Sequence, residues 1–194
     1  MLAAIIDIPA NVGYAAVFGL IAIETMGIPV PGETALIAAA LLAQKGRMEI
    51  VPLVALAAAA AILGDNVGFA IGRKGGRRLF MRPGPFHAQR LRVIEIGEPF
   101  FERHGPKAVF LGRWVSGLRI ASAWLAGING MSWPVFLPWN ALGGILWASS
   151  VGFGVYALGR VAEDAFRVVG PVAGAIAVAL LVIALVVRHR RARR

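Results

Sequence analysis

Long charge-free stretches of apolar residues alternate with short polar segments along this chain, a pattern that predicts membrane-spanning helices. A helix needs about 20 apolar residues to cross the hydrocarbon core of a bilayer. The run 168–187 meets this length without a charge, and 50–72 meets it with Asp65 as its single charge. The charge-free run 120–159 is long enough for two crossings, or for one crossing and a broken segment. The predicted spans are 50–72, 133–158 and 168–187, with a broken segment at 108–132.

Two shorter apolar runs, 8–23 and 34–44, flank a polar break that reads ETMGIPVPGE. Neither run is long enough for a confident crossing. Proline lacks an amide hydrogen and clashes with the preceding helical turn, so we expect Pro29 and Pro31 to end the incoming helix. Gly32 permits backbone angles that other residues avoid, which favours a sharp turn here.

The break also carries carboxylates inside an apolar region. We expect a side-chain oxygen of Glu33 or Thr34 to cap the outgoing helix. Irregular backbone at membrane depth survives only when it is buried in protein or lines a watery cavity. We therefore interpret 8–44 as a re-entrant hairpin, or a broken helix, whose tip carries Glu24 and Glu33. The alternative is a polar loop outside the bilayer between two short helices.

A second charged segment lies within the predicted broken region and reads GRWVSGLRIASAWLAG. Arg113 and Arg119 lie about 240° apart on a straight helix, but a break at Ser116 and Gly117 would direct both guanidiniums into one cavity. Intramembrane arginine is costly and marks a functional site with an acidic or anionic partner. Guanidinium also matches the geometry of phosphate. The alternative is that these arginines only extend to the membrane interface.

Composition supports the membrane interpretation. The chain is 58% hydrophobic and 15% charged, with a mean hydropathy of +0.73, whereas soluble domains carry about a quarter charged residues. We predict an all-α polytopic membrane protein with about three to four spanning helices. The net charge of +10 does not indicate nucleic acid, because so apolar a chain would keep no soluble surface. There are no cysteines, and we expect neither a metal nor a cofactor.

Basic residues predict the orientation. Residues 73–92 contain lysines and arginines but no acid, and the tail 188–194 is mostly arginine. Such clusters favour the cytoplasmic side, so we expect a basic cytoplasmic loop at 73–107 and a cytoplasmic C-terminus. Both clusters should contact anionic lipids. The first residues, MLAAIIDIPA, lack the basic region of a cleaved signal peptide.

The two halves of the chain echo each other. The segment VGFAIGR at 67–73 returns as VGFGVYALGR at 151–160. Paired broken segments in internal repeats are typical of secondary transporters, whose substrate site lies where the repeats meet. Close helix packing is the alternative explanation for the glycines, which recur at every fourth position at Gly64, Gly68, Gly72 and Gly76.

An enzyme is not expected. The histidines are His87 and His104 in the basic loop and His189 in the tail, so no nucleophile–base pair lies within the membrane. No metalloprotease or phosphate-loop motif occurs. We therefore expect no catalytic residue.

Together these residues resemble the DedA family, also called SNARE-associated or VTT-domain membrane proteins. The resemblance covers roughly 21–160 and departs from the family pattern at Trp114, usually Phe or Tyr, and at Ser116, usually proline. It rests on the following residues: Glu24, Pro29–Glu33, Gly64, Asp65, Gly72, Arg73, Arg113, Arg119, Ala126, Gly127, Met131, Phe136, Asn140, Gly143 and Trp147.

The resemblance implies two re-entrant hairpins that meet in the middle of the membrane. Family members are linked to moving polyprenyl-phosphate carrier lipids such as undecaprenyl phosphate, or other phospholipids, between leaflets of the cell (inner) membrane, with roles in envelope maintenance. The functional residues it implies are Glu24, Glu33, Arg113 and Arg119.

We therefore predict a lipid flippase coupled to protons. Arg113 and Arg119 would bind the lipid phosphate, and Glu24, Glu33 and Asp65 would exchange protons. The alternative is a proton- or sodium-coupled transporter of small ions that maintains the membrane potential. The sequence is compatible with a homo-oligomer and sets neither the lipid nor the side of the N-terminus.

Overall fold

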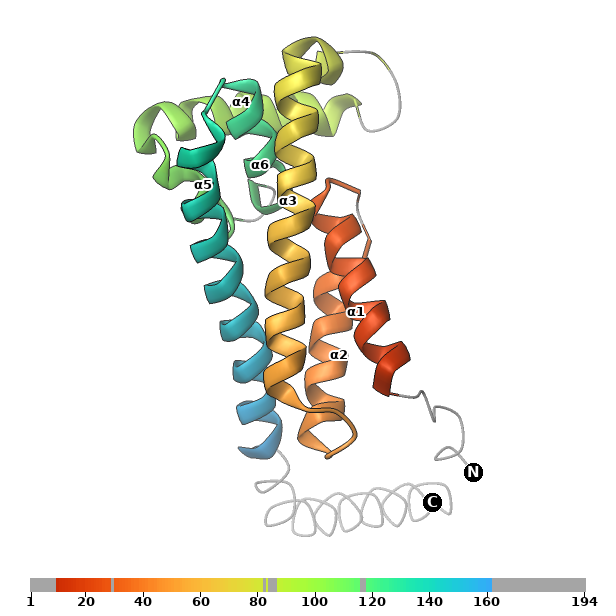
Figure 1. Ribbon diagram of the computed structural model, residues 1–194. Helices are drawn as coiled ribbons and strands as arrows, with labels where there is room; N and C mark the ends of the chain where they lie inside the picture. The colour runs from red at the N-terminus through yellow and green to blue at the C-terminus, as the bar shows by residue number, and fades with distance from the viewer. Residues whose placement is uncertain (1–9, 29, 82, 84–86, 116–117, 162–194) are drawn as a thin grey trace, which may run out of the picture. The chain divides into compact units, whose positions relative to one another are not determined.

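The computed structural model describes residues 10–28, 30–81, 83, 87–115 and 118–161. Within these ranges the secondary structure is helical, without a strand (Figure 1). Contacts divide the chain into two units, Met1–Tyr156 and Ala157–Arg194. All the contacts described below lie within the first unit. The predicted span 168–187 and the basic tail 188–194 lie outside the described residues.

Two helices are long and apolar enough to cross a membrane, Ile50–Gly76 and Trp133–Val161. They confirm the helices predicted at 50–72 and 133–158. The first belongs to α3 (Ile50–Met81), which is kinked at Gly76, where φ is 56°. A residue with a side chain rarely adopts this angle, so glycine permits the change of direction there.

The N-terminal segment forms a helical hairpin. Helices α1 (Ala10–Thr25) and α2 (Gly32–Gln44) contact each other, and both contact α3 (Figure 1). The break occurs where the sequence predicts it. α1 already ends at Thr25 and the chain turns at Gly27, where φ is 106°. Pro31 is instead the N-cap residue of α2, and Pro29 lies outside the described residues.

Gly32 has a packing role rather than the expected conformational one. It is the first residue of α2 and is not among the glycines with positive φ. A Cβ atom there would lie 2.9 Å from the Cα of Ile21 in α1. Gly64 in α3 likewise faces the Thr25 hydroxyl and the Ala22 carbonyl. Glycine at these two positions therefore lets both α2 and α3 approach α1 closely.

The region predicted as a basic loop, 73–107, is largely helical. α3 continues to Met81, and α4 spans His87–His104. α4 is amphipathic and packs against α6 through Ile94 and Phe101. The sequence did not predict this helix, because charged residues interrupt its hydrophobic positions. Its side of the membrane stays a prediction.

The predicted broken segment at 108–132 is a broken helix. α5 (Lys107–Gly112) and α6 (Leu118–Ile128) are separated by turns at 113–115. α6 packs against α3, and the Trp124 side chain lies against Gly68. Ser116 and Gly117, the predicted break residues, lie outside the described positions.

Two apolar cores form around α3. One joins α1, α2 and the first half of α3, and it includes Ala61. The other joins α4, α5 and α6 and includes Phe69, whose ring stacks on Phe136 at 4.4 Å. Asp65 lies four positions from each of these α3 residues, at the boundary between the cores.

The close approach at Gly64 predicts that one added methyl group lowers the stability of the protein strongly. Gly64→Ala would push a Cβ into Thr25 and the Ala22 carbonyl, and overpacking of this kind costs about 1–3 kcal/mol. Thermal unfolding in detergent should therefore begin at a lower temperature.

Gly19→Ala is the matched control, because a Cβ at Gly19 meets no atom within 4 Å. Alanine there should leave the midpoint unchanged or raise it slightly, since alanine is the better helix former. Equal midpoints for both variants would contradict the close packing of α1 on α3.

Candidate functional site

A buried ion pair joins the middle of α3 to the end of α5. The Arg113 Nη2 group donates to the Asp65 Oδ2 atom, and only 2% of each side chain is exposed. The same Nη2 group donates to Asn140 Oδ1 at 2.8 Å. Asn140 Nδ2 in turn donates to the carbonyl of Ile62 at 3.2 Å. The pair therefore ties α3, α5 and the Trp133–Val161 helix together.

Not every polar atom of this pair is hydrogen-bonded. Within the described residues, no partner bonds to Asp65 Oδ1 or to Arg113 Nε. The arginine side chain fits because Gly143 faces it; a Cβ there would lie 2.9 Å from Arg113 Cδ. Removing one partner of a buried pair leaves an uncompensated charge, so the two residues depend strongly on each other.

A second cluster forms at the tip of the α1–α2 hairpin. The Arg119 Nη2 atom lies 2.7 Å from Glu24 Oε1 and 3.2 Å from Glu33 Oε2. The backbone N–H of Glu33 donates to Glu24 Oε2 at 3.0 Å. Glu24 thus holds the arginine with one oxygen and the start of α2 with the other. Its side chain is 6% exposed, against 41% for Glu33 and 20% for Arg119.

The capping prediction for α2 is therefore wrong. The N-cap residue is Pro31, which offers no side-chain cap. The carboxylate that accepts the exposed backbone N–H comes from Glu24 in the other arm of the hairpin. This long-range cap also places negative charge at the positive end of the helix macrodipole.

Aromatic and charged neighbours complete the surroundings of Arg119. Its guanidinium carbon lies 5.6 Å from the ring centroid of Trp147, within cation–π distance. The members of the two ion-paired groups are together called the charged cluster: Arg113, Asp65, Arg119, Glu24 and Glu33.

The predicted site residues form two ion-paired groups rather than one. Arg113 and Arg119 lie on either side of a break, as expected, but they pair with different carboxylates. Arg119 pairs with both Glu24 and Glu33. Asp65, predicted only as a further proton acceptor, is the partner of Arg113. The groups of three or more His, Asp or Glu side chains that a metal would need do not occur among the described residues.

Two site residues were missed. Asn140 is a polar amide within an otherwise apolar predicted span, and this signal could have identified it. Trp147 carries no such polar signal, and like Asn140 it is noted in the sequence only as part of the family resemblance.

Comparisons with known proteins identify the family of this chain. The model of the VTT domain matches residues 30–160. An uncharacterized membrane protein of Mycobacterium tuberculosis (strain H37Rv) is 38% identical over 193 residues, which cover 96% of this chain and 88% of that protein. Another, from Synechocystis, is 37% identical over 155 residues, covering 80% and 71%. Protein DedA of Escherichia coli K12 is 31% identical over 188 residues, covering 92% and 84%. No solved structure matches the chain.

These observations define an all-helical membrane protein with a charged cluster between its apolar cores. The chain belongs to the DedA family of VTT-domain membrane proteins, as its residues suggest. It is, broadly, a membrane transporter. None of the three relatives is named for an enzymatic activity.

A double-mutant cycle tests the buried pair. Asp65→Ala and Arg113→Ala each leave one buried charge unpaired, and each should destabilise the protein by about 3–5 kcal/mol. The double variant should lose clearly less than the sum, because no charge remains unpaired. Unfolding in detergent measures the three values.

Arg92→Ala, on the exposed side of α4, serves as the control and should change stability by less than about 0.5 kcal/mol. If the single variants fail to accumulate in the membrane, recovery of the double variant gives the same result. Additive losses would show that the two side chains do not support each other.

Proposed function

We propose that this protein moves a phosphate-bearing lipid, a polyprenyl phosphate or a phospholipid, between the leaflets of a cell membrane, and that this movement is coupled to protons. The observation that carries the proposal is the position of Arg119, which is shared by two carboxylates and remains partly exposed. Transport of a small ion, driven by protons or sodium, is the competing function.

The guanidinium of Arg119 is chemically suited to a lipid phosphate. Its planar fork can donate two parallel hydrogen bonds to phosphate oxygens, as it does to a carboxylate. Glu24 and Glu33 therefore occupy the place that a phosphate would take. A ligand must displace at least one of them.

Protonation provides the means of displacement. Glu33 has the more exposed side chain and the longer contact with Arg119, 3.2 Å against 2.7 Å for Glu24. A proton on Glu33 removes its negative charge and frees one edge of the guanidinium. Lipid phosphate then binds there, while Glu24 keeps Arg119 in place.

The role of Arg113 differs in this proposal. Its guanidinium is buried against Asp65 and Asn140, so a phosphate reaches it only after this pair opens. Asp65 is then the second proton acceptor. Passage of the lipid from Arg119 to Arg113 would move the phosphate between two sites in the protein.

The lengths of the helices support a re-entrant arrangement. α1 and α2 have 16 and 13 residues, and α5 and α6 have 6 and 11. All four are shorter than the roughly 20 residues needed to cross the hydrocarbon core. We propose that both pairs enter the membrane as hairpins and meet at the charged cluster, with the basic region 73–107 and the C-terminus on the cytoplasmic side.

The function is tested in vesicles that contain the purified protein. Labelled polyprenyl phosphate reports lipid movement between leaflets, and ion-sensitive dyes report ion flux in the same preparation. Lipid movement that depends on a proton gradient supports the proposal. Ion flux without lipid movement would support the competing function.

Substitution of Arg119 distinguishes phosphate recognition from simple charge. Arg119→Lys keeps the charge but loses the planar fork, so lipid movement should fall nearly as far as in Arg119→Ala, by at least about tenfold. Full activity in the lysine variant would mean that Arg119 acts as a point charge or as an ion-pair partner only.

The pH profile separates the two glutamates. Glu33→Gln should stay folded and lose the increase in lipid binding as the pH falls, because the group that is protonated is gone. Glu24→Gln should instead lose stability as well as transport, because Glu24 holds both Arg119 and the start of α2. Transport rates over a range of pH, with unfolding midpoints, measure both effects.

One result would contradict a role of these glutamates in proton coupling. If both variants keep the wild-type pH profile at a lower rate, the two glutamates are structural. Asp65 would then be the next proton acceptor to test.

A further inference from the structure

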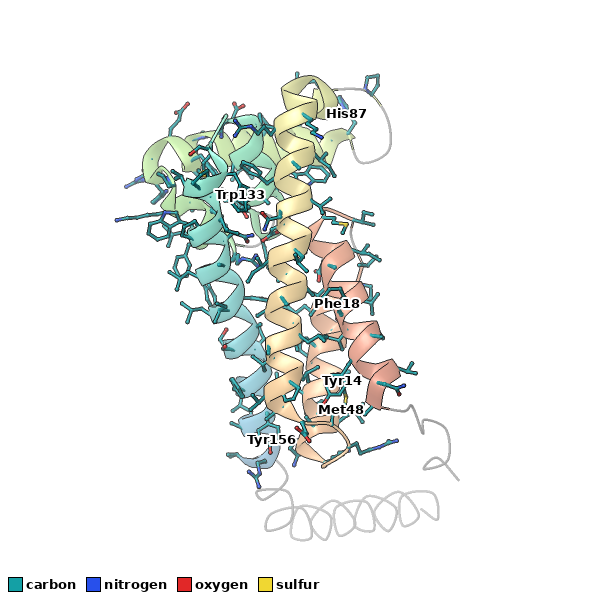
Figure 2. The ribbon with its side chains drawn as sticks, in the orientation of Figure 1. Tyr14, Phe18, Met48, His87, Trp133 and Tyr156 are labelled. Carbon is teal, nitrogen blue, oxygen red and sulfur yellow. The ribbon has the colours of Figure 1, made fainter. Side chains whose placement is uncertain are left out.

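An apolar groove of about 740 Å³ runs between α1 and α3, on the side away from the charged cluster. Glu24 lies two positions after Ala22 in α1, and Asp65 lies two positions before Val67 in α3. Two positions correspond to about 200° around a helix, so these two acidic residues lie on the helix faces away from the groove. The side chains that form most of the groove come from α1, from the residue that follows it and from α3: Phe18 (labelled in Figure 2), Ala22, Met26, Val67, Ala70 and Ile71.

The groove is open to its surroundings. Val67 is 41% exposed and Leu63, at one end, is 55% exposed. Both belong to a helix that is long and apolar enough to span a membrane. In a membrane protein such side chains face lipid hydrocarbon rather than water, so an apolar chain could lie along this groove.

One end of the groove is charged. Lys74 lines it, two residues before the end of the candidate span Ile50–Gly76. Within the described residues no ion pair of Lys74 occurs, and no acidic residue lines the groove. The other polar lining residue, Asn66, is already bonded to the Trp133 indole at 2.8 Å and to the Ile62 carbonyl at 2.7 Å. Lys74 is therefore the polar group available to a ligand.

We propose that this groove binds a hydrocarbon chain of an anionic lipid whose phosphate pairs with Lys74. From Leu63 to Lys74 the groove follows α3 for about 16 Å, a length suited to much of one lipid chain. Lysine lays its own alkyl stem along apolar surface while its ammonium group reaches the headgroup region. The proposal rests on the proposed function in one respect, since a lipid held here is the class of substrate that the charged cluster would receive.

Photo-crosslinking of lipids to the unmodified protein tests the proposal. Vesicles contain phosphatidylglycerol or phosphatidylcholine with the same diazirine-bearing chain at the same mole fraction, and mass spectrometry maps the crosslinked residues. Phosphatidylglycerol should label residues 63–71 and 18–26 about fivefold more than phosphatidylcholine does, the preference expected for one lysine near an anionic headgroup. Exposed Leu142 and Ile145, on another helix, should show no preference.

Two variants make the result specific. Lys74→Gln should reduce the labelling by phosphatidylglycerol to the level of phosphatidylcholine. Ala70→Trp should block labelling by both lipids, because it fills the groove. Ala59→Trp, at an exposed α3 position that does not line the groove, is the matched control and should leave the labelling unchanged.

Two labelling results would overturn the proposal. Equal labelling by both lipids would mean that the headgroup is not recognised. Absence of labelling would mean that protein covers the groove, either a second copy or another segment of this chain. Selective labelling without movement of polyprenyl phosphate would leave the groove standing and the proposed function refuted, whereas movement without selective labelling would refute the groove alone.

Discussion

A charge inside an apolar protein needs an opposite charge and hydrogen bonds close to it, because the loss of water otherwise costs several kcal/mol per ion. Arg113 and Arg119 both lie where the cores around α3 meet, and each has a carboxylate within bonding distance. These contacts draw together segments that are far apart in sequence. The ion pairs join the tip of the α1–α2 hairpin and the middle of α3 to the broken α5–α6 segment.

The two ion pairs differ in ways that suit different tasks. Arg113 and Asp65 are almost fully buried, and Asn140 links them to the Trp133–Val161 helix. Arg119 is shared between a buried glutamate and a half-exposed one. A buried pair stabilises one arrangement of helices, whereas a shared and partly exposed arginine exchanges partners at low cost. In our proposal the second pair meets the proton and the lipid first.

Much of this organisation could be predicted from the sequence, for physical reasons. The helices that begin at Ile50 and Trp133 follow from hydrophobic length, and the breaks follow from charges, prolines and glycines within apolar runs. The pairing of each arginine with its acid could not be predicted, because it depends on how each helix is rotated and where each break ends. The chain turns at Gly27, and the N–H group at the start of α2 donates to Glu24, which lies in the other arm of the hairpin.

The central claim is that Glu33 and a lipid phosphate compete for the guanidinium of Arg119. It is tested most directly by the equilibrium affinity for a short-chain polyprenyl phosphate at neutral pH, measured for the wild type and for Glu33→Gln. A partly exposed ion pair contributes about 0.2–1 kcal/mol, so removing this competitor should tighten phosphate binding by up to about fivefold. Equal or weaker binding by Glu33→Gln would contradict the account.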